Sequence, residues 1–405
     1  MTSDRKKPPE TTDPEGWRQA TRLVRGGLAR SGFGETSEAL FLNSGFVYDS
    51  AEAAEARFKG EDEGFIYSRY GNPTVRMFEE RLTLLEGAEA CFATASGMAA
   101  VFASMMCFLK TGQRVVASRA LFGSCHHIIT QILPRFGIET ELVDGPDLEQ
   151  WRRALAPGAA AVFLESPANP TLELIDIPEV CALAKAAGAR VIVDNVFATP
   201  LQQKPLALGA DIVVYSATKH IDGQGRCLAG AVLGSKAYID DELQPFMRHT
   251  GPALSPFNAW VMLKGLETLE LRVERQCANA LAVAEALEGQ GSFSRVLYPG
   301  LASHPQHDLA RRQMSGNGTL VAFELPGGKA PAFRFLNALG LIDISNNLGD
   351  SKTLITHPAT TTHRAMGPEG RAQIGVTDGM LRLSVGLEDP ADLTEDLLQA
   401  LEIAL

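Results

Sequence analysis

The sequence predicts an α/β fold, with a large domain built on a parallel sheet and a smaller α+β domain after it. Between about residues 74 and 250, short apolar runs rich in β-branched residues alternate with helical patterns, which is typical of a parallel sheet with crossover helices. The chain has 405 residues, more than one domain usually contains. Ser255-Pro256 then opens a long apolar and charged segment that reaches about Leu287 and would bridge to the second domain.

The chain is expected to have four parts. Residues 1–16 are polar, and we expect a disordered tail there. We expect an arm over residues 17–73, the large domain over residues 74–255, and the bridging helix with the small domain over residues 256–405. The sequence contains no evident internal repeat.

The first strand and helix of the large domain fall between residues 90 and 109. Ala90 to Thr94 has the pattern of a strand, and Gly97 opens an apolar helix that we expect to reach about Leu109. Gly97 has no side chain to block an anion, and the first amide groups of a helix are free donors. The uncharged run is long enough to span a bilayer, which takes roughly 20 residues, but polar residues and a glycine interrupt it. A buried strand and helix is therefore favoured.

A second buried-strand pattern, residues 190–194, ends in the carboxylate of Asp194. The carboxyl ends of parallel strands form the edge where open α/β sheets bind ligands. A buried aspartate at this edge can stabilise a protonated ring nitrogen of a cofactor. The alternative is that Asp194 caps the helix that follows.

A third buried-strand pattern would place Lys219 at the same edge of the sheet. Ile212, Val213 and Val214 form a buried strand, and Ser216 and Thr218 then place hydroxyl groups beside the lysine. Desolvation lowers the pKa of a lysine, and an amine next to an anion-binding turn is what pyridoxal phosphate requires. On local grounds alone, a solvated loop lysine remains an alternative.

The composition is that of an ordinary globular protein, with 45% hydrophobic and 21% charged residues. A net charge of -11 and the absence of a basic stretch argue against binding to nucleic acid. The six cysteines have no paired spacing, and no apolar segment begins the chain, so we expect a cytoplasmic protein with reduced thiols and no membrane association. His304 and His307 lack a cluster of further ligands, so we expect no metal site.

Several motifs in one order resemble the PLP-dependent enzymes of cysteine and methionine metabolism, which have the aspartate aminotransferase fold (fold type I). The resemblance runs from about Thr36 to the end of the chain. The motifs are residues 67–74 (YSRYGNPT), 96–100 (SGMAA), 165–170 (ESPANP), 193–195 (VDN), 216–219 (SATK) and 382–386 (RLSVG).

The resemblance implies a role for each matching residue. Lys219 would be the catalytic residue and would bind pyridoxal 5'-phosphate covalently, Asp194 would pair with the ring nitrogen, and Arg382 would bind the substrate's α-carboxylate. A guanidinium suits that last role, because it forms two parallel bonds with a carboxylate. The other cofactor contacts would come from Ser216, Thr218, Gly97 and Met98 at the phosphate, Phe122 and Asn169 at the ring, and Tyr67 and Arg69 of the neighbouring subunit. Each site would therefore need two chains, and we expect a homotetramer of dimers.

The chain departs from the wider family at two places near the predicted site. Most members stack a tyrosine on the ring, whereas this chain has Phe122, which lacks a hydroxyl group for proton transfer. After the lysine, Asp222-Gly223-Gln224-Gly225-Arg226 replaces the usual Asn-Gly-His-Ser-Asp, so a base stands in the place of an acid. We expect Asn347, in the run 346–350, to contact the substrate, and we hypothesise that Arg226 binds a second substrate carboxylate. An ion pair between Arg226 and a local acid is an equal alternative.

These features, with residues 356–363, resemble the family branch that acts on O-succinylhomoserine and sulfide to give homocysteine and succinate. The implied activity is a γ-replacement in methionine biosynthesis. Cystathionine γ-synthase, cystathionine γ-lyase and O-acetylhomoserine sulfhydrylase activities remain alternatives within the family. A PLP-binding protein without turnover is a more remote one.

Overall fold

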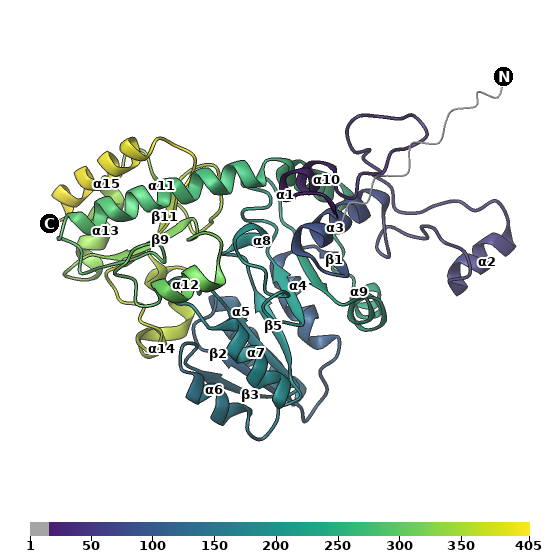
Figure 1. Ribbon diagram of the computed structural model, residues 1–405, viewed down its shortest axis with the longest axis horizontal. Coiled ribbons are helices and arrows are strands. Elements are labelled where there is room, and N and C mark those ends of the chain that lie inside the picture. Colours follow the sequence, from purple (N-terminus) through teal and green to yellow (C-terminus); the bar gives the residue numbers. More distant parts are fainter. Residues whose placement is uncertain (1–15) are drawn as a thin grey trace.

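The computed structural model describes residues 16–405, so the tail predicted over residues 1–16 lies almost entirely outside the described residues. The described chain contains one sheet of seven strands and one of five. A long helix, α11 (Leu269–Gly289), runs from the region of the larger sheet along the smaller one (Figure 1).

The seven-stranded sheet has the order β1-β7-β6-β5-β4-β2-β3. Its strands are β1 (Ala90–Thr94), β2 (Arg114–Ser118), β3 (Glu139–Val143), β4 (Ala161–Glu165), β5 (Arg190–Asp194), β6 (Ile212–Tyr215) and β7 (Gly230–Gly234). The strands predicted at residues 90–94 and 190–194 are confirmed, and the run that begins at Ile212 extends to Tyr215.

The sheet is mixed rather than wholly parallel, because β7 is antiparallel to both of its neighbours, β6 and β1. Parallel neighbours need a crossover of about a dozen residues or more, usually a helix. Residues 216–229, between β6 and β7, form turns and no helix, and the chain returns directly alongside β6. This segment carries Ser216, Thr218 and Lys219, so the irregular connection lies at the predicted site.

Helices cover both faces of the large sheet, which explains why its inner strands are largely apolar, whereas the edge strand β3 is mostly polar. Val115 and Ile192 pack into one core cluster, whereas Val116, Val191 and Val193 pack into another. The helices of this region are α3 (Pro73–Glu86), α4 (Gly97–Met106), α5 (Gly123–His127), α6 (Leu148–Leu155), α7 (Ile177–Ala186), α8 (Thr199–Gln202) and α9 (Gln244–Thr250). Helix α4 begins at Gly97 as predicted and ends three residues before the predicted end.

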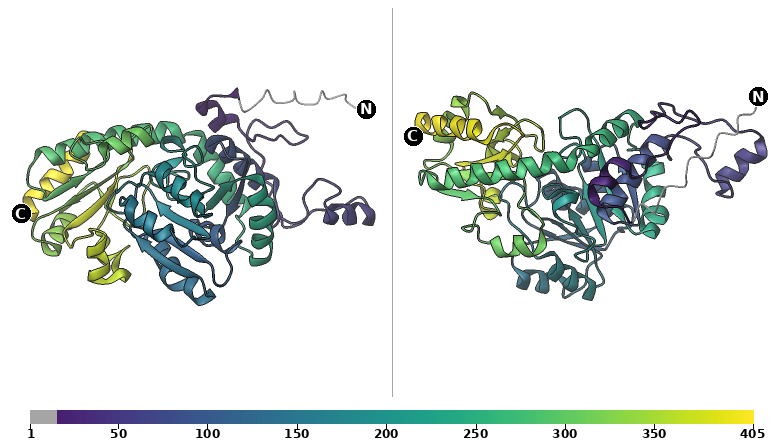
Figure 2. Two further views of the ribbon diagram at one scale, coloured as in Figure 1. Left: turned by 60° about the horizontal axis from the view of Figure 1, so that its bottom comes forward. Right: turned by 45° about the horizontal axis from the view of Figure 1, so that its top comes forward.

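The segment that precedes α3 leaves apolar side chains exposed. It contains α1 (Gln19–Arg25) and α2 (Ala51–Lys59), and Figures 1 and 2 show α2 projecting away from the rest of the chain. Phe33 and Val47 are 91% and 94% exposed. Such an apolar extension is typical of a segment that packs against another chain.

The predicted bridging helix begins at Pro256 but is interrupted at Thr268, so it forms two helices, α10 (Pro256–Glu267) and α11. Ser255 occupies the N-cap position of α10, although its side chain accepts no capping hydrogen bond.

The smaller sheet has the order β10-β11-β12-β9-β8. Its strands are β8 (Arg295–Leu297), β9 (Leu320–Glu324), β10 (Asp343–Ile344), β11 (Leu354–Thr356) and β12 (Met380–Ser384), and the helices after α11 are α12 (His307–Gln313), α13 (Lys329–Ala338), α14 (Gly367–Gln373) and α15 (Pro390–Ala404). One apolar cluster joins α11, α13 and α15 to this sheet. Among residues 16–405, no helix is both long and apolar enough to cross a membrane.

Candidate active site

A cavity of about 280 Å³ lies at the carboxyl ends of β4, β5 and β6 of the larger sheet. Nine of the residues predicted from the sequence line it: Gly97, Met98, Phe122, Asn169, Asp194, Ser216, Thr218, Lys219 and Arg382. They come from positions spread over nearly three hundred residues, and β12 brings Arg382 to the cavity from the smaller sheet. The fold therefore gathers one set of polar groups around one cavity.

The amino end of α4 lies in the cavity wall and has the geometry of a cradle for an anion. Ser96 caps the helix by accepting a hydrogen bond from the Ala99 N–H (3.2 Å). A Cβ atom on residue 97 would lie 2.5 Å from Ser216 Cβ, so only glycine allows this close approach. Free amide groups at a helix start and a hydroxyl group from the facing turn suit a phosphate.

We expect the substitution Gly97→Ala to weaken binding of pyridoxal phosphate, because the added methyl group would push the Ser216 turn away from α4. Overpacking of this kind costs roughly 1–3 kcal/mol, which corresponds to about 5- to 150-fold in the dissociation constant. Titration of the apoprotein with the cofactor, followed by visible absorption, measures the effect. Gly289→Ala is a matched control, because nothing lies within 4 Å of that position. Equal losses of affinity in the two variants would refute the cradle.

Two buried carboxyl groups stand side by side in the cavity wall. Asp194 ends β5 and Glu165 ends β4, and the two residues are paired in the register of these strands. Burial raises the pKa of Asp194. Burial, followed by the charge of Asp194, raises the pKa of Glu165 well above its usual range.

Glu165 was not identified as a site residue from the sequence. Its two carboxyl oxygens accept hydrogen bonds from the backbone N–H groups of Phe122 and Asn169, each at 2.8 Å. It therefore holds Phe122 and Asn169, two of the residues that were predicted to contact the cofactor ring. The sequence contains a pattern that could have identified it, since Glu165 ends a buried apolar strand just as Asp194 does.

Lys219 faces the cavity from the turn after β6. Its Nζ donates a hydrogen bond to Asn347 Oδ1 (2.6 Å). Burial, with a smaller contribution from the charge of Arg382, lowers the pKa of Lys219 to about 8. A substantial fraction of this amine is therefore neutral near pH 8 and available as a base or nucleophile. Asn347 was predicted to contact the substrate, and here it orients the lysine.

Arg382 is 1% exposed and is held in a fixed orientation. Its Nη1 donates to Asn169 Oδ1 (3.0 Å), and its Nη2 donates to the carbonyl oxygens of Asn346 (3.0 Å) and Asn347 (3.2 Å). Burial lowers the pKa of Arg382 to about 10. Its buried Nε has no hydrogen-bond partner among the described residues. A buried cation with a free donor is suited to an anionic ligand.

Phe122 lines the cavity at the N-cap of α5, and no tyrosine lines the described wall. Thr362, which was given no role from the sequence, lines the wall nearby. The carbonyl oxygen of Thr362 would lie 2.4 Å from a Cβ atom on residue 123, so the loop after β11 packs tightly over the start of α5. Leu228 and Cys125 complete this side of the cavity.

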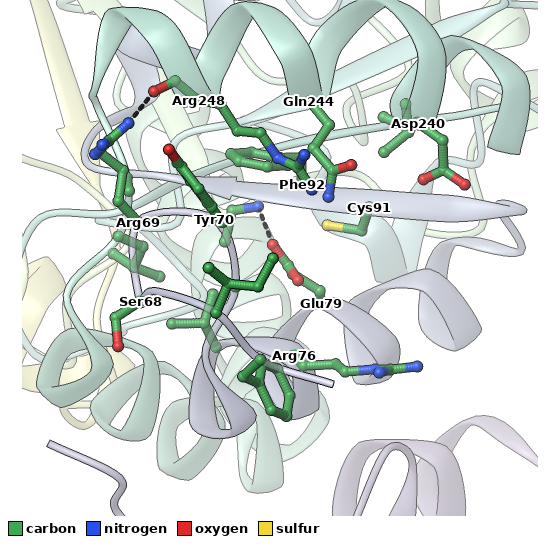
Figure 3. A pocket seen from close by; sticks show the side chains of 18 of the residues that line it. Ser68, Arg69, Tyr70, Arg76, Glu79, Cys91, Phe92, Asp240, Gln244 and Arg248 are labelled. Atoms are coloured by element: carbon green, nitrogen blue, oxygen red, sulfur yellow. Dashed lines mark hydrogen bonds between the residues drawn. The ribbon is translucent and has the colours of Figure 1, made fainter. Parts of the chain in front are cut away.

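Tyr67 and Arg69 do not line this cavity. Arg69 lies at a second cavity, where its guanidinium stacks on Tyr70 (4.8 Å) and donates a hydrogen bond to the carbonyl oxygen of Arg248 (Figure 3). Tyr67 is 42% exposed. Within one chain, the structure does not bring these two residues to Lys219.

Arg226 is also absent from the described cavity wall. Its Nε donates to Asp222 Oδ1 (2.8 Å), and its backbone N–H donates to Asp222 Oδ2 (2.6 Å). This is the local ion pair that the sequence left open as an alternative to substrate binding. A contact between Arg226 and the substrate stays a prediction.

Comparison with known proteins agrees with the geometry. The family described as "Cys/Met metabolism PLP-dependent enzyme" matches residues 20–402. The chain is 61% identical over 392 residues to the O-succinylhomoserine sulfhydrylase of Mycobacterium tuberculosis (strain H37Rv), covering 96% of this chain and 97% of the relative. It is 50% identical over 390 residues to that of Pseudomonas aeruginosa, covering 96% of both.

A solved structure is similar over nearly the whole chain. It is a putative O-acetylhomoserine (thiol)-lyase from Campylobacter jejuni that contains N'-pyridoxyl-lysine-5'-monophosphate. The TM-score is 0.91 at 32% identity, covering 95% of this chain and 100% of the other.

Proposed function

Since the chain belongs to the family of PLP-dependent enzymes of Cys/Met metabolism, we propose that it replaces the succinyloxy group of O-succinyl-L-homoserine with sulfide. The Cγ–O bond breaks, succinate leaves with the electron pair, and a Cγ–S bond forms to give L-homocysteine. The names of relatives that are 50% and 61% identical support this substrate pair.

One observation carries the proposal. Lys219, whose pKa burial lowers to about 8, shares a cavity with the buried groups of Asp194 and Arg382. A partly neutral amine, a ring-nitrogen partner and a carboxylate-binding group are the components that a PLP enzyme needs for an amino-acid substrate.

The residues around the cavity fit pyridoxal phosphate. The close approach of Gly97 to Ser216 suits the phosphate, Asp194 suits the ring nitrogen, and Phe122 suits the ring face. When bound, the cofactor withdraws electrons from the substrate, which acidifies the Cα–H bond and permits loss of a group from Cγ. The protein then has to bind the substrate, orient it and move protons.

Lys219 is the residue that moves protons. Its Nζ can take a proton from Cα and return it, and Asn347 Oδ1 holds the amine in one direction by accepting its hydrogen bond. Phe122 stands where a hydroxyl group could otherwise share this work, so the task falls on Lys219. Arg382 binds the α-carboxylate. Asn169 holds the guanidinium of Arg382 in one orientation by accepting its hydrogen bond.

The function is tested by identifying products. Protein and pyridoxal phosphate are mixed with O-succinylhomoserine and either sulfide or cysteine, and O-acetylhomoserine is run in parallel. We expect homocysteine with sulfide and little cystathionine with cysteine. Efficient cystathionine formation would favour cystathionine γ-synthase activity instead. Preference for the acetyl ester would favour O-acetylhomoserine sulfhydrylase activity. If no substrate turned over, the protein would be assigned as one that binds the cofactor without catalysis.

The pH dependence of cofactor attachment gives an independent prediction. Only the neutral amine of Lys219 is nucleophilic, and burial lowers its pKa to about 8, so the neutral form grows as the pH rises through that value. We expect the rate at which apoprotein gains visible absorption to rise between about pH 7 and pH 9 and then level off. Stopped-flow mixing with pyridoxal phosphate measures this rate. A rate that continued to rise up to the ordinary lysine pKa, near 10.4, would contradict the lowered pKa.

We further propose a cytoplasmic homotetramer made of two dimers with shared active sites. The exposed apolar segment before α3 supports an exchange of arms between chains. Tyr67 and Arg69 lie outside their own chain's cavity, as residues that serve a neighbour would. All six cysteines are unpaired, which suits a reducing compartment.

Shared sites predict complementation between two inactive variants. Lys219→Ala and Arg69→Ala chains should each be inactive alone, but a mixed dimer contains one site with both Lys219 and Arg69 intact. Random pairing of equal amounts should restore about a quarter of the wild-type activity, because half of the two-fold dimers are mixed and each has one intact site. Activity assays on co-expressed chains measure this. Mixtures that stay inactive, although mass spectrometry detects mixed dimers, would contradict a shared site.

A further inference from the structure

Behind the cavity wall, three buried polar side chains from different elements form a network of hydrogen bonds. Asn195 follows Asp194 at the end of β5, and its Nδ2 donates to Tyr215 Oη (2.7 Å) at the end of β6. The same hydroxyl group donates to Glu86 Oε2 (2.6 Å) at the end of α3. The three side chains are at most 3% exposed. We call them the Asn195–Tyr215–Glu86 network.

The network lies directly behind two groups of the cofactor site. Asp194 and Ser216 line the cavity, and Asn195 and Tyr215 are their neighbours in the chain, with side chains that face the opposite side of the sheet. Asp194 pairs with Val214 in the sheet register, and the Asn195 N–H donates to the Val214 carbonyl oxygen (3.2 Å). The hydrogen bond between Asn195 and Tyr215 therefore cross-links, from behind, the two strand ends that carry Asp194 and Ser216.

Further bonds to Asn195 make this cross-link rigid. Its Nδ2 also approaches the carbonyl oxygens of Gln203 (3.0 Å) and Thr199 (3.2 Å), and its Oδ1 accepts from Gln203 Nε2 (2.8 Å). Thr199 has a left-handed backbone (φ 61°), a conformation that persists only where surrounding contacts fix it. The chain after Asp194 is thus folded back and fixed by one side chain. The side-chain groups of Asn195 and the Tyr215 hydroxyl group are all hydrogen-bonded, whereas Glu86 Oε1 has no partner among the described residues. Buried polar groups with satisfied hydrogen bonds make the surrounding structure rigid.

We infer that the Asn195–Tyr215–Glu86 network is a positioning device for the cofactor, which fixes the separation between the ring-nitrogen partner Asp194 and the phosphate ligand Ser216. The inference rests on the proposed roles of Asp194 and Ser216 and is independent of which substrate the enzyme uses. None of the three side chains lines the cavity, so the network acts through the two residues that do.

The substitution Tyr215→Phe tests the inference, because it removes both hydrogen bonds of the hydroxyl group and keeps the ring. The apoprotein is titrated with pyridoxal phosphate, and visible absorption and visible circular dichroism are recorded. We expect the dissociation constant to rise about tenfold, the effect of losing two buried hydrogen bonds, together with a changed dichroism of the bound cofactor.

A matched control separates positioning from stability. Tyr298 is also a fully buried tyrosine, and its hydroxyl group donates to the carbonyl oxygen of Gly318 (3.0 Å) in the core of the smaller sheet. Tyr298→Phe should lower the melting temperature by a similar amount and leave cofactor affinity unchanged. If Tyr215→Phe also loses only stability and binds the cofactor as the wild type does, the network is merely structural and the inference fails.

A second pair of variants keeps the test decisive if Tyr215→Phe does not fold. Glu86→Gln retains an oxygen that can accept the Tyr215 hydrogen bond, whereas Glu86→Ala removes it. We expect affinity within about threefold of the wild type for glutamine and the tenfold loss for alanine. Equal affinities in these two variants would overturn the inference. Because no substrate is present, a wrong substrate assignment would leave this result unchanged.

Discussion

Replacing Lys219 with alanine is expected to abolish both turnover and the visible absorption of the bound cofactor. Lys219 is the one lysine among the described residues that line the cavity, so no other amine can take over the covalent attachment or the proton transfers. Loss of the group proposed to serve as base and nucleophile should reduce kcat by roughly 10⁴-fold or more. Steady-state assays and an absorption spectrum of the variant with added cofactor test this result.

Two further variants make the Lys219 experiment specific. Lys219→Arg keeps a cation beside Asn347 but cannot lose its proton at ordinary pH, so it should be folded and equally inactive. Lys264→Ala removes a partly buried lysine that is paired with Glu38 and Glu267, away from the cavity, and should retain the absorption. Substantial turnover by Lys219→Ala would overturn the assignment of the catalytic residue.

The regular part of the fold could be predicted because burial on both faces leaves a simple pattern. The strands at residues 90–94 and 190–194 are uncharged except at their ends, and the structure has the same bounds. The direction of β7 could not be predicted in this way. Apolar periodicity indicates that a strand is buried but carries no information on its direction, which here follows from a return without a helix.

The break at Thr268 was missed for a related reason. The apolar and charged pattern continues from Pro256 to about Leu287 and is compatible with one helix. In the structure, α10 packs on α3 of the large domain and α11 packs on the smaller sheet, so the two halves have different partners. A change of direction between two packing surfaces is a tertiary effect that a local pattern does not contain.

The candidate site could be predicted where a residue contributes a distinctive functional group. Asp194 and Lys219 are charged residues at or just after the ends of buried strands, which is rare without a reason, whereas the role of Arg382 was predicted only from the resemblance to the family. Glu165 has the same signal, but its role lies in accepting two backbone N–H groups, and sequence patterns do not specify such bonds. Arg226 was given a role from its charge alone, and its pairing with Asp222 depends on the shape of one turn.

The second large effect is expected at Arg382. Arg382→Ala removes the buried group proposed to bind the α-carboxylate and leaves a cavity where Asn169 and two carbonyl oxygens lose their donor. Truncating one side of a buried, charged hydrogen-bonded pair costs about 2–5 kcal/mol, so kcat/KM should fall at least about 30-fold. Arg382→Lys keeps the charge without the two-pronged geometry and should lie between the wild type and alanine.

A fall in activity alone could reflect damage to the core, so the informative measurement is ligand discrimination. Wild-type protein should bind O-succinylhomoserine much more tightly than the corresponding amine that lacks the α-carboxylate, and Arg382→Ala should bind the two about equally. Arg226→Ala is the control that removes an arginine near Lys219 in the sequence, and it should retain the preference because Arg226 is paired with Asp222 outside the cavity wall. If Arg382→Ala kept the preference for the α-carboxylate, another cation would have to bind that group. Among the described residues that line the cavity, only Lys219 could then do so, and it could not at the same time be the neutral base that the proposed reaction requires.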